Sequence, residues 1–414
     1  MMKETISVNS QKMELLRKDY PILHQSVHGS PLVYLDNAAT SQKPQLVIDE
    51  INRYYTEINA NIHRGAHYLA SMATAAYEES RTFISEFIGA KHSHEIIFCS
   101  GTTEGINLIA HSLGRAVLKP GDEIIISAME HHSNIVPWQL ACEYYGAKLK
   151  VIPMSEAGEL DVDAFAKLLS EKTKIVSIVQ VSNSLGTVNP VKEMTGMARE
   201  AGAYVIIDGA QSIPHMKVDV QDLDCDFFVF SGHKALGPTG IGVVYGKEKV
   251  LEMIPPYQSG GEMIESVSFE KTTFNKLPFK FEAGTPHIEG GIVLGSALKY
   301  LSSIGLDEIS AYEQELHGYQ EKLLLEIEGL EIIGTAKQKA SLTSFLVAGI
   351  HPFDLGALLD QMGIAVRTGH HCTQPVMDFY GIPGTVRSSL AFYNSYDDIE
   401  RFVTALKKAI SMLK

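Results

Sequence analysis

Short apolar runs alternate with helical patterns between residues 95 and 245, and this alternation limits the possible folds more than any other feature. The runs are rich in Ile, Val and Phe, as strands buried on both faces of a sheet are. Helical patterns at 133–145 and 191–201 lie between them. The alternation predicts βαβ units around a mostly parallel sheet. The expected strands are 123–127, 148–152, 175–179, 204–207, 227–230 and 242–245.

The rest of the chain predicts a second, smaller unit. Residues 255–286 are rich in Gly, Pro and Phe and are expected to form loops, and two long helical patterns follow from residue 289. Strand-like runs at 344–347 and 364–367 precede an amphipathic helix near 397–413. We expect an α/β fold with an N-terminal segment (1–30), a large domain with helices on both faces of its sheet (31–288) and a smaller α+β domain (289–414).

The composition is that of an ordinary globular protein and argues against several classes of function. The formal net charge of −14 disfavours nucleic acid and anionic membranes as main partners. No apolar run has the length of a signal peptide or a membrane span, so we expect a cytoplasmic protein. The four cysteines form no CxxC pair, which predicts neither a disulfide framework nor a structural metal site. Cys99, Cys142 and Cys225 lie on apolar patterns and are expected in the core.

An acid and an amine follow two neighbouring strands of the predicted sheet. Asp208 ends the run Val205-Ile-Ile-Asp208, and Lys234 follows 227–230 and precedes a glycine-rich turn at 237–242. Parallel strands bring such side chains together at their carboxyl ends. A lysine can hold the aldehyde of pyridoxal phosphate as a Schiff base, and a buried aspartate can keep the pyridine nitrogen protonated. Most lysines are surface charges, but this position fits that alternative poorly, and we therefore predict a pyridoxal phosphate site.

A third segment, Ser100-Gly-Thr-Thr-Glu-Gly-Ile-Asn107, follows a strand-like run and opens a helical pattern. Backbone amides at such a helix start, with the hydroxyls of Thr102 and Thr103, can hold a phosphate. The same residues also suit a capping box, in which Glu104 serves the helix alone. The neighbouring Asp208 and Lys234 motifs favour phosphate binding.

Three further side chains suggest chemistry at the same site. His131 follows a strand end, where its ring can stack on a pyridine and an imidazole with an ordinary pKa can move protons; His132 is read as a plain loop residue. Cys372 lies on a loop beside His370 and His371, where a thiol can be partly deprotonated. Arg387 is the best candidate to bind a carboxylate, with a surface ion pair as its alternative.

A zinc ligand and an inert thiol are the other interpretations of Cys372. Three consecutive residues rarely reach one metal ion, and no second CxxC or HxxxH completes a set, so we expect no metal.

The chain resembles the group II (SufS-type) cysteine desulfurases, within the fold-type I, class V aminotransferase-like enzymes. Several motifs in the family's order carry the resemblance over nearly the whole length. They are Tyr34-Leu-Asp-Asn-Ala-Ala-Thr40, Asn61-Ile-His-Arg64-Gly, Ser100-Gly-Thr-Thr-Glu-Gly-Ile-Asn107, Ser231-Gly-His-Lys234 and Arg367-Thr-Gly-His-His-Cys372. Relatives often carry His where this chain has Gln180.

The resemblance implies roles for individual residues. Thr103, Ser231 and His233 would contact the cofactor phosphate, and Gln211 its phenolic oxygen. Asn183 would contact the ring or the substrate, and His131 would stack on the ring and transfer protons. Thr285 would reach the cofactor of a neighbouring subunit in a homodimer, whereas His63 and Arg64 receive no firm role.

The resemblance also implies a reaction. L-Cysteine would lose its sulfur to Cys372, which becomes a persulfide, and leave as L-alanine, with Lys234 moving the Cα proton and Arg387 holding the carboxylate. The sulfur would pass to a SufE-like or SufU-like acceptor protein for iron-sulfur cluster assembly. A selenocysteine lyase acting on L-selenocysteine, a class V aminotransferase and a non-catalytic scaffold are the alternatives. The Cys372 loop disfavours the aminotransferase, and the intact set of site residues disfavours the scaffold.

Overall fold

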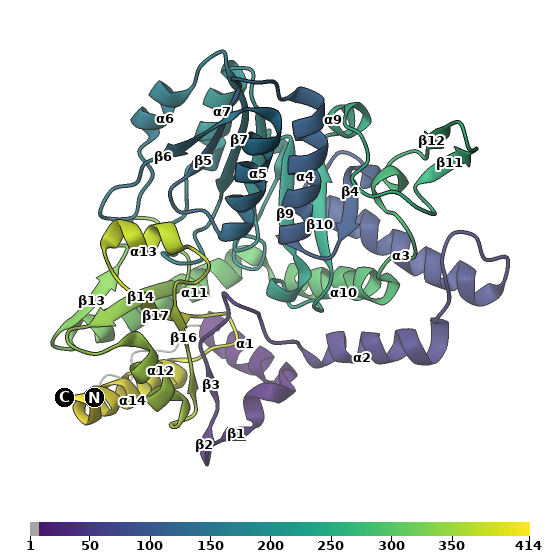
Figure 1. The fold of residues 1–414 in the computed structure, drawn as a ribbon. Coiled ribbons are helices and arrows are strands. Elements are labelled where there is room, and N and C mark those ends of the chain that lie inside the picture. The colour runs from purple at the N-terminus through teal and green to yellow at the C-terminus, as the bar shows by residue number, and fades with distance from the viewer. Residues whose placement is uncertain (1–7) are drawn as a thin grey trace.

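A seven-stranded sheet forms the centre of the computed structural model, which describes residues 8–414 (Figure 1). Its strand order is β4-β10-β9-β8-β7-β5-β6. Neighbouring strands run parallel from β9 to β6, and β10 is antiparallel to both of its neighbours. The predicted mostly parallel sheet is therefore confirmed. The strands are β4 (Ile96–Cys99), β5 (Glu123–Ser127), β6 (Lys148–Ile152), β7 (Thr173–Val179), β8 (Tyr204–Asp208), β9 (Phe227–Ser231) and β10 (Gly242–Gly246).

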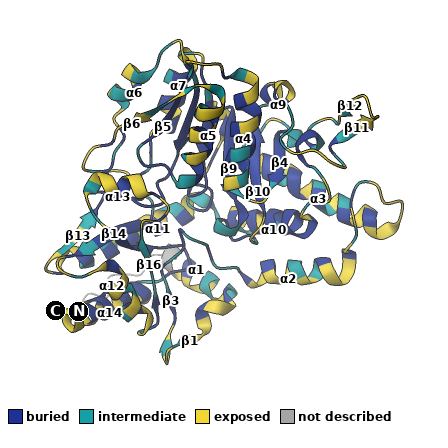
Figure 2. Cartoon of the chain, viewed as in Figure 1, coloured by how far each residue is buried: buried dark blue, intermediate teal, exposed yellow. Residues whose placement is uncertain are grey.

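Both faces of this sheet are covered by helices, which explains why its strands are apolar throughout. Ile124 and Ile126 belong to one hydrophobic cluster, whereas Ile125 between them belongs to the other. All residues of β5, β9 and β10 are buried (Figure 2). In β8 only Tyr204 is not fully buried. Side chains of α4 (Thr102–Val117) and α5 (Val136–Tyr145) belong to the first cluster. Those of α3 (Tyr68–Phe87), α7 (Val191–Glu200) and α10 (Ile288–Ile304) belong to the second. Burial of this apolar surface is the main stabilising contribution.

Helices connect and flank these strands. The helices of this part of the chain are α2 (Gln45–Arg53), α3 (Tyr68–Phe87), α4 (Thr102–Val117), α5 (Val136–Tyr145), α6 (Val162–Leu168), α7 (Val191–Glu200), α8 (Val220–Leu223), α9 (Glu248–Met253) and α10 (Ile288–Ile304). The predicted helix at 133–145 begins as a short 3-10 turn at His132–Asn134 before α5.

A smaller antiparallel sheet of four strands lies beside the first, with the order β13-β14-β17-β16. Its strands are β13 (Leu330–Ile333), β14 (Leu342–Val347), β16 (Arg367–Gly369) and β17 (Thr385–Ser389). The helices α11 (Leu306–Leu325), α12 (Pro352–Asp360), α13 (Gln374–Tyr380) and α14 (Tyr396–Leu413) accompany it. The boundary at residues 288 and 289 stays a prediction.

The N-terminal part of the described chain joins this smaller sheet region. It contains α1 (Val8–Leu16), β1 (Ser26–Val27), β2 (Ser30–Pro31) and β3 (Val33–Tyr34). β3 pairs in parallel with β15 (Ile364–Ala365), and Asp36 forms a bridge with Ser389 at the end of β17. The chain then crosses to the large sheet, so that Asp36 to Thr40 lie between the two sheets.

Two expectations were incomplete. The stretch at 255–286 contains a hairpin, β11 (Ile264–Val267) and β12 (Thr272–Phe274), whose residues are mostly exposed and gave no clear alternation. The expected strand at 364–367 is split into β15 and β16, which pair in different sheets. No described helix is long and apolar enough to cross a membrane.

Three of the cysteines fit a structural role. Cys225 is buried, and Cys99 and Cys142 are half-buried. Burial raises the pKa of Cys99 to about 12 and that of Cys142 to about 11, and it also raises the pKa of Cys225. These thiols stay protonated at neutral pH and are poor nucleophiles.

Candidate active site

A cavity of about 260 Å³ opens where the carboxyl ends of the large sheet meet the loops of the smaller one. Every predicted site residue except Thr285 lines it. These residues are Thr103, His131, Asn183, Asp208, Gln211, Ser231, His233, Lys234, Cys372 and Arg387. Thr102, expected as a further phosphate contact, and His371, expected beside the thiol, also line it. Ala38, Ala39, Ser133, Val179, Val181, Ala210 and Arg367 complete the lining and were not predicted. The fold therefore brings together side chains that lie far apart in sequence.

Lys234 and Asp208 face this cavity from neighbouring strands. Asp208 ends β8 and accepts a hydrogen bond from the backbone N–H of Ala210 at 2.9 Å, and burial raises its pKa. Lys234 follows β9 in a 3-10 turn (Gly232–Lys234). Burial lowers the pKa of Lys234 to about 8, although the Asp208 carboxylate opposes this shift. Roughly a tenth of the amine is therefore neutral at pH 7, far more than for an ordinary lysine, and the neutral form is the one that attacks an aldehyde.

The start of α4 adjoins the Lys234 turn through Ser231. The Ser231 Oγ accepts a hydrogen bond from the N–H of Thr102 at 2.8 Å and lies 2.8 Å from the Thr102 hydroxyl. Gly101, with φ of 151°, and Gly242 allow the close approach, because a Cβ on Gly242 would lie 2.5 Å from the Cα of Gly101. The N-cap residue of α4 is Gly101, which has no side chain to cap the first turn. Its N-terminal dipole and Thr103 thus face the cavity and favour an anion.

The capping role that the sequence also allowed for Glu104 is partly present at the start of α4. The Glu104 carboxylate accepts the backbone N–H of Ser100 at 2.6 Å and does not enter the cavity. The segment therefore both stabilises its own helix start and presents an anion-binding surface.

His131 lies on the turn after β5, and its ring is neutral. Its Nδ1 accepts hydrogen bonds from the Ser133 N–H at 3.1 Å and the Ser133 hydroxyl at 2.8 Å. A backbone N–H can only donate, so the proton of the neutral imidazole is on Nε2. Burial, with a smaller contribution from Lys234, lowers the pKa of His131 to about 3. The expectation of an ordinary pKa was wrong, because sequence does not show how far the ring is removed from water.

Gln211 and Asn183 are each held by one backbone group. The Gln211 side-chain amide donates to the carbonyl oxygen of Ala38 at 2.7 Å. The Asn183 amide donates to the carbonyl oxygen of His371 at 2.7 Å, and its own Oδ1 is buried without a partner. Gln180, where relatives often carry His, donates its backbone N–H to the carbonyl oxygen of Asp208 at 2.9 Å.

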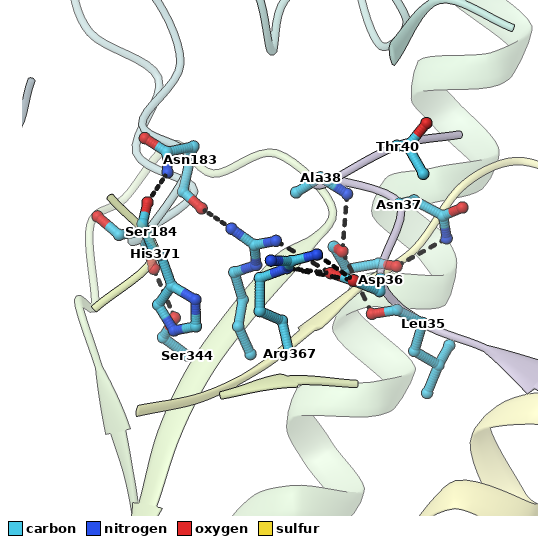
Figure 3. Close-up of polar contacts among 12 residues, drawn as sticks. Leu35, Asp36, Asn37, Ala38, Thr40, Asn183, Ser184, Ser344, Arg367 and His371 are labelled. Carbon is cyan, nitrogen blue, oxygen red and sulfur yellow. Dashed lines mark hydrogen bonds and ion pairs between the residues drawn. The ribbon is translucent and has the colours of Figure 1, made fainter. Parts of the chain in front are cut away.

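Two guanidinium groups share the Asp36 carboxylate at one wall of the cavity (Figure 3). Arg367 contacts both Asp36 oxygens, with Nε to Oδ1 at 3.0 Å and Nη2 to Oδ2 at 2.9 Å. Arg387 donates to Asp36 Oδ1 at 3.1 Å and to the carbonyl oxygen of Asn183 at 2.8 Å. Its Nε is buried and has no partner. Two cations and one carboxylate leave one positive charge for an incoming anion.

Arg387 is thus not a surface ion pair, because only 2% of its side chain is exposed. Burial lowers its pKa to about 10, with Asp36 opposing the shift, so that it remains a cation at neutral pH. Neither Asp36 nor Arg367 was given a role from sequence, although both lie within motifs that carry the family resemblance.

Cys372 is exposed on the loop between β16 and α13. His371 and Cys372 both adopt left-handed backbone conformations, with φ of 54° and 59°. The His371 ring turns inward and its Nε2 lies 2.8 Å from the Thr385 hydroxyl. Burial and the neighbouring arginines lower its pKa to about 2. His371 is therefore neutral and buried, which corrects the expectation that both adjacent imidazoles promote deprotonation of the thiol.

Thr285 lies outside this cavity and is exposed, after Glu282 in the segment that leads to α10. Among residues 8–414, no group of three or more His, Cys, Asp or Glu side chains has the arrangement of a metal site.

Comparison with known proteins identifies the family. The aminotransferase class-V model matches residues 33–402. A cysteine desulfurase of Synechococcus elongatus is 52% identical over 393 residues, which cover 95% of this chain and 63% of that protein. A probable cysteine desulfurase of Halalkalibacterium halodurans is 51% identical over 393 residues, which cover 95% of this chain and 97% of that protein. The solved apo structure of a cysteine desulfurase from Thermococcus onnurineus NA1 has a TM-score of 0.92 at 40% identity and covers 100% of both chains.

The chain thus spans less than two thirds of the Synechococcus protein but nearly all of the other two. The likeness to solved cysteine desulfurases over the full length confirms the predicted fold class. Together with the family match over most of the sequence, it shows that this chain belongs to the aminotransferase class-V family, among relatives that are cysteine desulfurases.

Proposed function

We propose that this protein is a pyridoxal phosphate-dependent cysteine desulfurase that converts L-cysteine to L-alanine and carries the sulfur as a persulfide on Cys372. One observation carries the proposal. The exposed Cys372 thiol lines the same cavity as the Lys234 amine, the Asp208 carboxylate and the buried Arg387. Transamination needs an amine and an acid but no thiol, so the cysteine distinguishes desulfuration from the other reactions of this fold.

The residues of the cavity suit pyridoxal phosphate. The neutral fraction of Lys234 would take its aldehyde, and Asp208 would hold a proton at its ring nitrogen. Thr103, Ser231, His233 and the open first turn of α4 would hold its phosphate, and Gln211 its phenolic oxygen. The flat neutral ring of His131 suits stacking. When bound, the cofactor supplies an acceptor for the electrons released at the substrate Cα.

Arg387 suits the substrate carboxylate. Its buried and unpartnered Nε requires an acceptor, and the wall formed with Asp36 and Arg367 has one unbalanced positive charge. A single α-carboxylate satisfies both conditions through charge-assisted hydrogen bonds. Lys234 would be the base that moves the substrate Cα proton.

The sulfur step belongs to Cys372. Its thiolate forms an S–S bond with the substrate sulfur while the Cβ–S bond of the substrate breaks. The electron pair of the broken bond stays with the carbon fragment, which is protonated and leaves as alanine. The neutral His131, with its Nε2–H directed by the Ser133 contacts, can donate a hydrogen bond to the groups that react.

The proposal includes a homodimer and a protein acceptor of the SufE or SufU kind that serves iron-sulfur cluster assembly. The exposed position of Thr285 outside its own cavity is consistent with a contact to a neighbouring subunit's cofactor. The exposure of Cys372 suits collection of its sulfur by a partner. A cytoplasmic location is part of the same proposal and agrees with the free cysteines.

The test is release of sulfide and alanine from L-cysteine in the presence of a thiol reductant. We expect equal amounts of both products from the unmodified protein and none from Lys234→Ala. Cys372→Ala should bind L-cysteine with the same change in cofactor absorbance but release little alanine. Pyruvate or 3-mercaptopyruvate as the main product would contradict the proposal and indicate elimination or transamination, respectively.

A further inference from the structure

The Cys372 loop has an unusual backbone that other residues must hold in place. His371 and Cys372 are consecutive non-glycine residues with positive φ. This left-handed region is unfavourable for residues with a Cβ and persists only when the surroundings fix it. The loop that presents the thiol is therefore positioned by contacts from outside itself.

Three hydrogen bonds from two turns of the large domain supply these contacts. Asn183 donates to the carbonyl oxygen of His371 at 2.7 Å. The backbone N–H of His132 donates to the carbonyl oxygen of Cys372 at 2.8 Å. The backbone N–H of Gln374 donates to the Nε2 of His132 at 3.0 Å. His132 thus contacts the thiol-bearing residue itself and the residue two positions after it.

The hydrogen bond from the Gln374 N–H determines the tautomer of the His132 ring. A backbone N–H can only donate, so Nε2 must carry a lone pair and the neutral ring bears its proton on Nδ1. Burial, with a smaller contribution from His370, lowers the pKa of His132, which favours this neutral form. The half-buried ring does not line the cavity.

We propose that His132 is a positioning residue for sulfur transfer, which holds the Cys372 loop against the turn after β5 through its Nε2 and its backbone N–H. The adjacent residue His131 faces the cavity, so a single turn places both the ring predicted to stack on the cofactor and the thiol. This inference rests on the proposed function, because the thiol must meet the sulfur atom of a substrate bound in the cavity that Lys234 also lines. A plain loop histidine, as the sequence suggested, would have no such effect.

Two substitutions separate the side-chain bond from the backbone bond. His132→Gln places a carbonyl oxygen near the position of Nε2 and can still accept from Gln374, whereas His132→Leu keeps bulk but cannot. Both variants retain the backbone N–H. His24→Gln, at an exposed histidine outside the cavity, is the matched control.

Two measurements on the protein with bound cofactor test the effect of these substitutions. Binding of L-alanine, followed by the absorbance of the cofactor, should be unchanged in all variants because it does not involve the thiol. Persulfide formation in a single turnover should slow in His132→Leu by about tenfold to a hundredfold, as expected for a misplaced reacting group. His132→Gln should recover most of this rate.

A third measurement needs neither cofactor nor turnover. In the cofactor-free protein, amide hydrogen exchange of the segment around Cys372 and Gln374 should be faster in His132→Leu than in His132→Gln. The alkylation of Cys372 by iodoacetamide should likewise be faster in His132→Leu than in His132→Gln.

Wild-type rates and exchange in His132→Leu would overturn the inference. Equal loss of alanine binding and sulfur transfer would overturn it too, because it would indicate a general role in the fold. If the unmodified protein formed no persulfide, the proposed function would fail, and the exchange and alkylation results would still decide whether His132 holds the loop.

Discussion

At the scale of single residues, burial decides the chemistry of Lys234. The pKa of this amine is lowered to about 8, so its neutral fraction rises through that pH. The initial rate at which cofactor-free protein captures added pyridoxal phosphate, read by absorbance or by borohydride fixation, should therefore rise with a midpoint near pH 8. An ordinary lysine would give a midpoint near 10.4. A midpoint above 10 would show that the amine is not desolvated.

Asp208 is the second residue whose environment sets its role. Its buried carboxylate ends β8 next to Lys234 and is the acid best placed to keep a pyridine nitrogen protonated. Asp208→Asn keeps the shape but loses the charge, and we expect turnover to fall on the order of a hundredfold. The exposed Asp163→Asn is the control, and it should retain full activity. Near-normal turnover in Asp208→Asn would mean that another group protonates the ring.

Residue types at strand ends were sufficient to predict the Asp208 and Lys234 pair, because the carboxyl ends of parallel strands meet. The states of the histidines could not be predicted. The low pKa of His131 and the inward turn of His371 depend on burial and on the Thr385 contact, which involve residues far apart in sequence. The role of Asp36 was missed for a similar reason, since it depends on pairing between the N-terminal segment and the small sheet.

At the scale of elements, a buried ion pair holds the segment before α10 to α3. Arg81, 1% exposed, contacts Glu282 at 2.7 and 2.9 Å, and Glu282 also accepts the N–H of Phe98 in β4. Glu282→Ala leaves the buried guanidinium with only the Glu78 carboxylate as an ion-pair partner and leaves the Phe98 N–H without its acceptor, so it should destabilise the protein by about 2–4 kcal/mol. Urea unfolding measures this as a lower midpoint.

The matched control is Glu79→Ala, which removes the exposed partner of Lys299 from the same helix. Its effect should stay within about 1 kcal/mol. Equal shifts for the two variants would contradict a structural role for the Arg81–Glu282 pair.

The strands of the large sheet have strong sequence patterns and were predicted. Elements with weak patterns were not. The buried strands at 123–127 and 227–230 are continuous apolar runs, so they were predicted nearly to their observed bounds. The β11–β12 hairpin is mostly exposed and lacks a buried face, which removes the alternation on which prediction depends. The break between β15 and β16 follows from pairing with two different sheets, which a single run of residues does not reveal.

At the scale of the whole molecule, the candidate site is shared between two sheets. The large sheet supplies Asp208 and Lys234, and the smaller sheet region supplies Arg387 and Cys372. The residues proposed to hold the cofactor and the residue proposed to take the sulfur thus come from different parts of the chain, and the hydrogen bond between His132 and the Cys372 loop joins the two parts.

The central claim is that sulfur leaves the substrate as a persulfide on Cys372. The most direct measurement is mass spectrometry of the holoenzyme after a short exposure to L-cysteine without reductant or acceptor. We predict one additional sulfur atom on the peptide that contains Cys372, about one per subunit, together with one alanine, and its removal by a reductant. Undiminished alanine release by Cys372→Ala, with no added sulfur on Cys372 in the unmodified protein, would contradict the account.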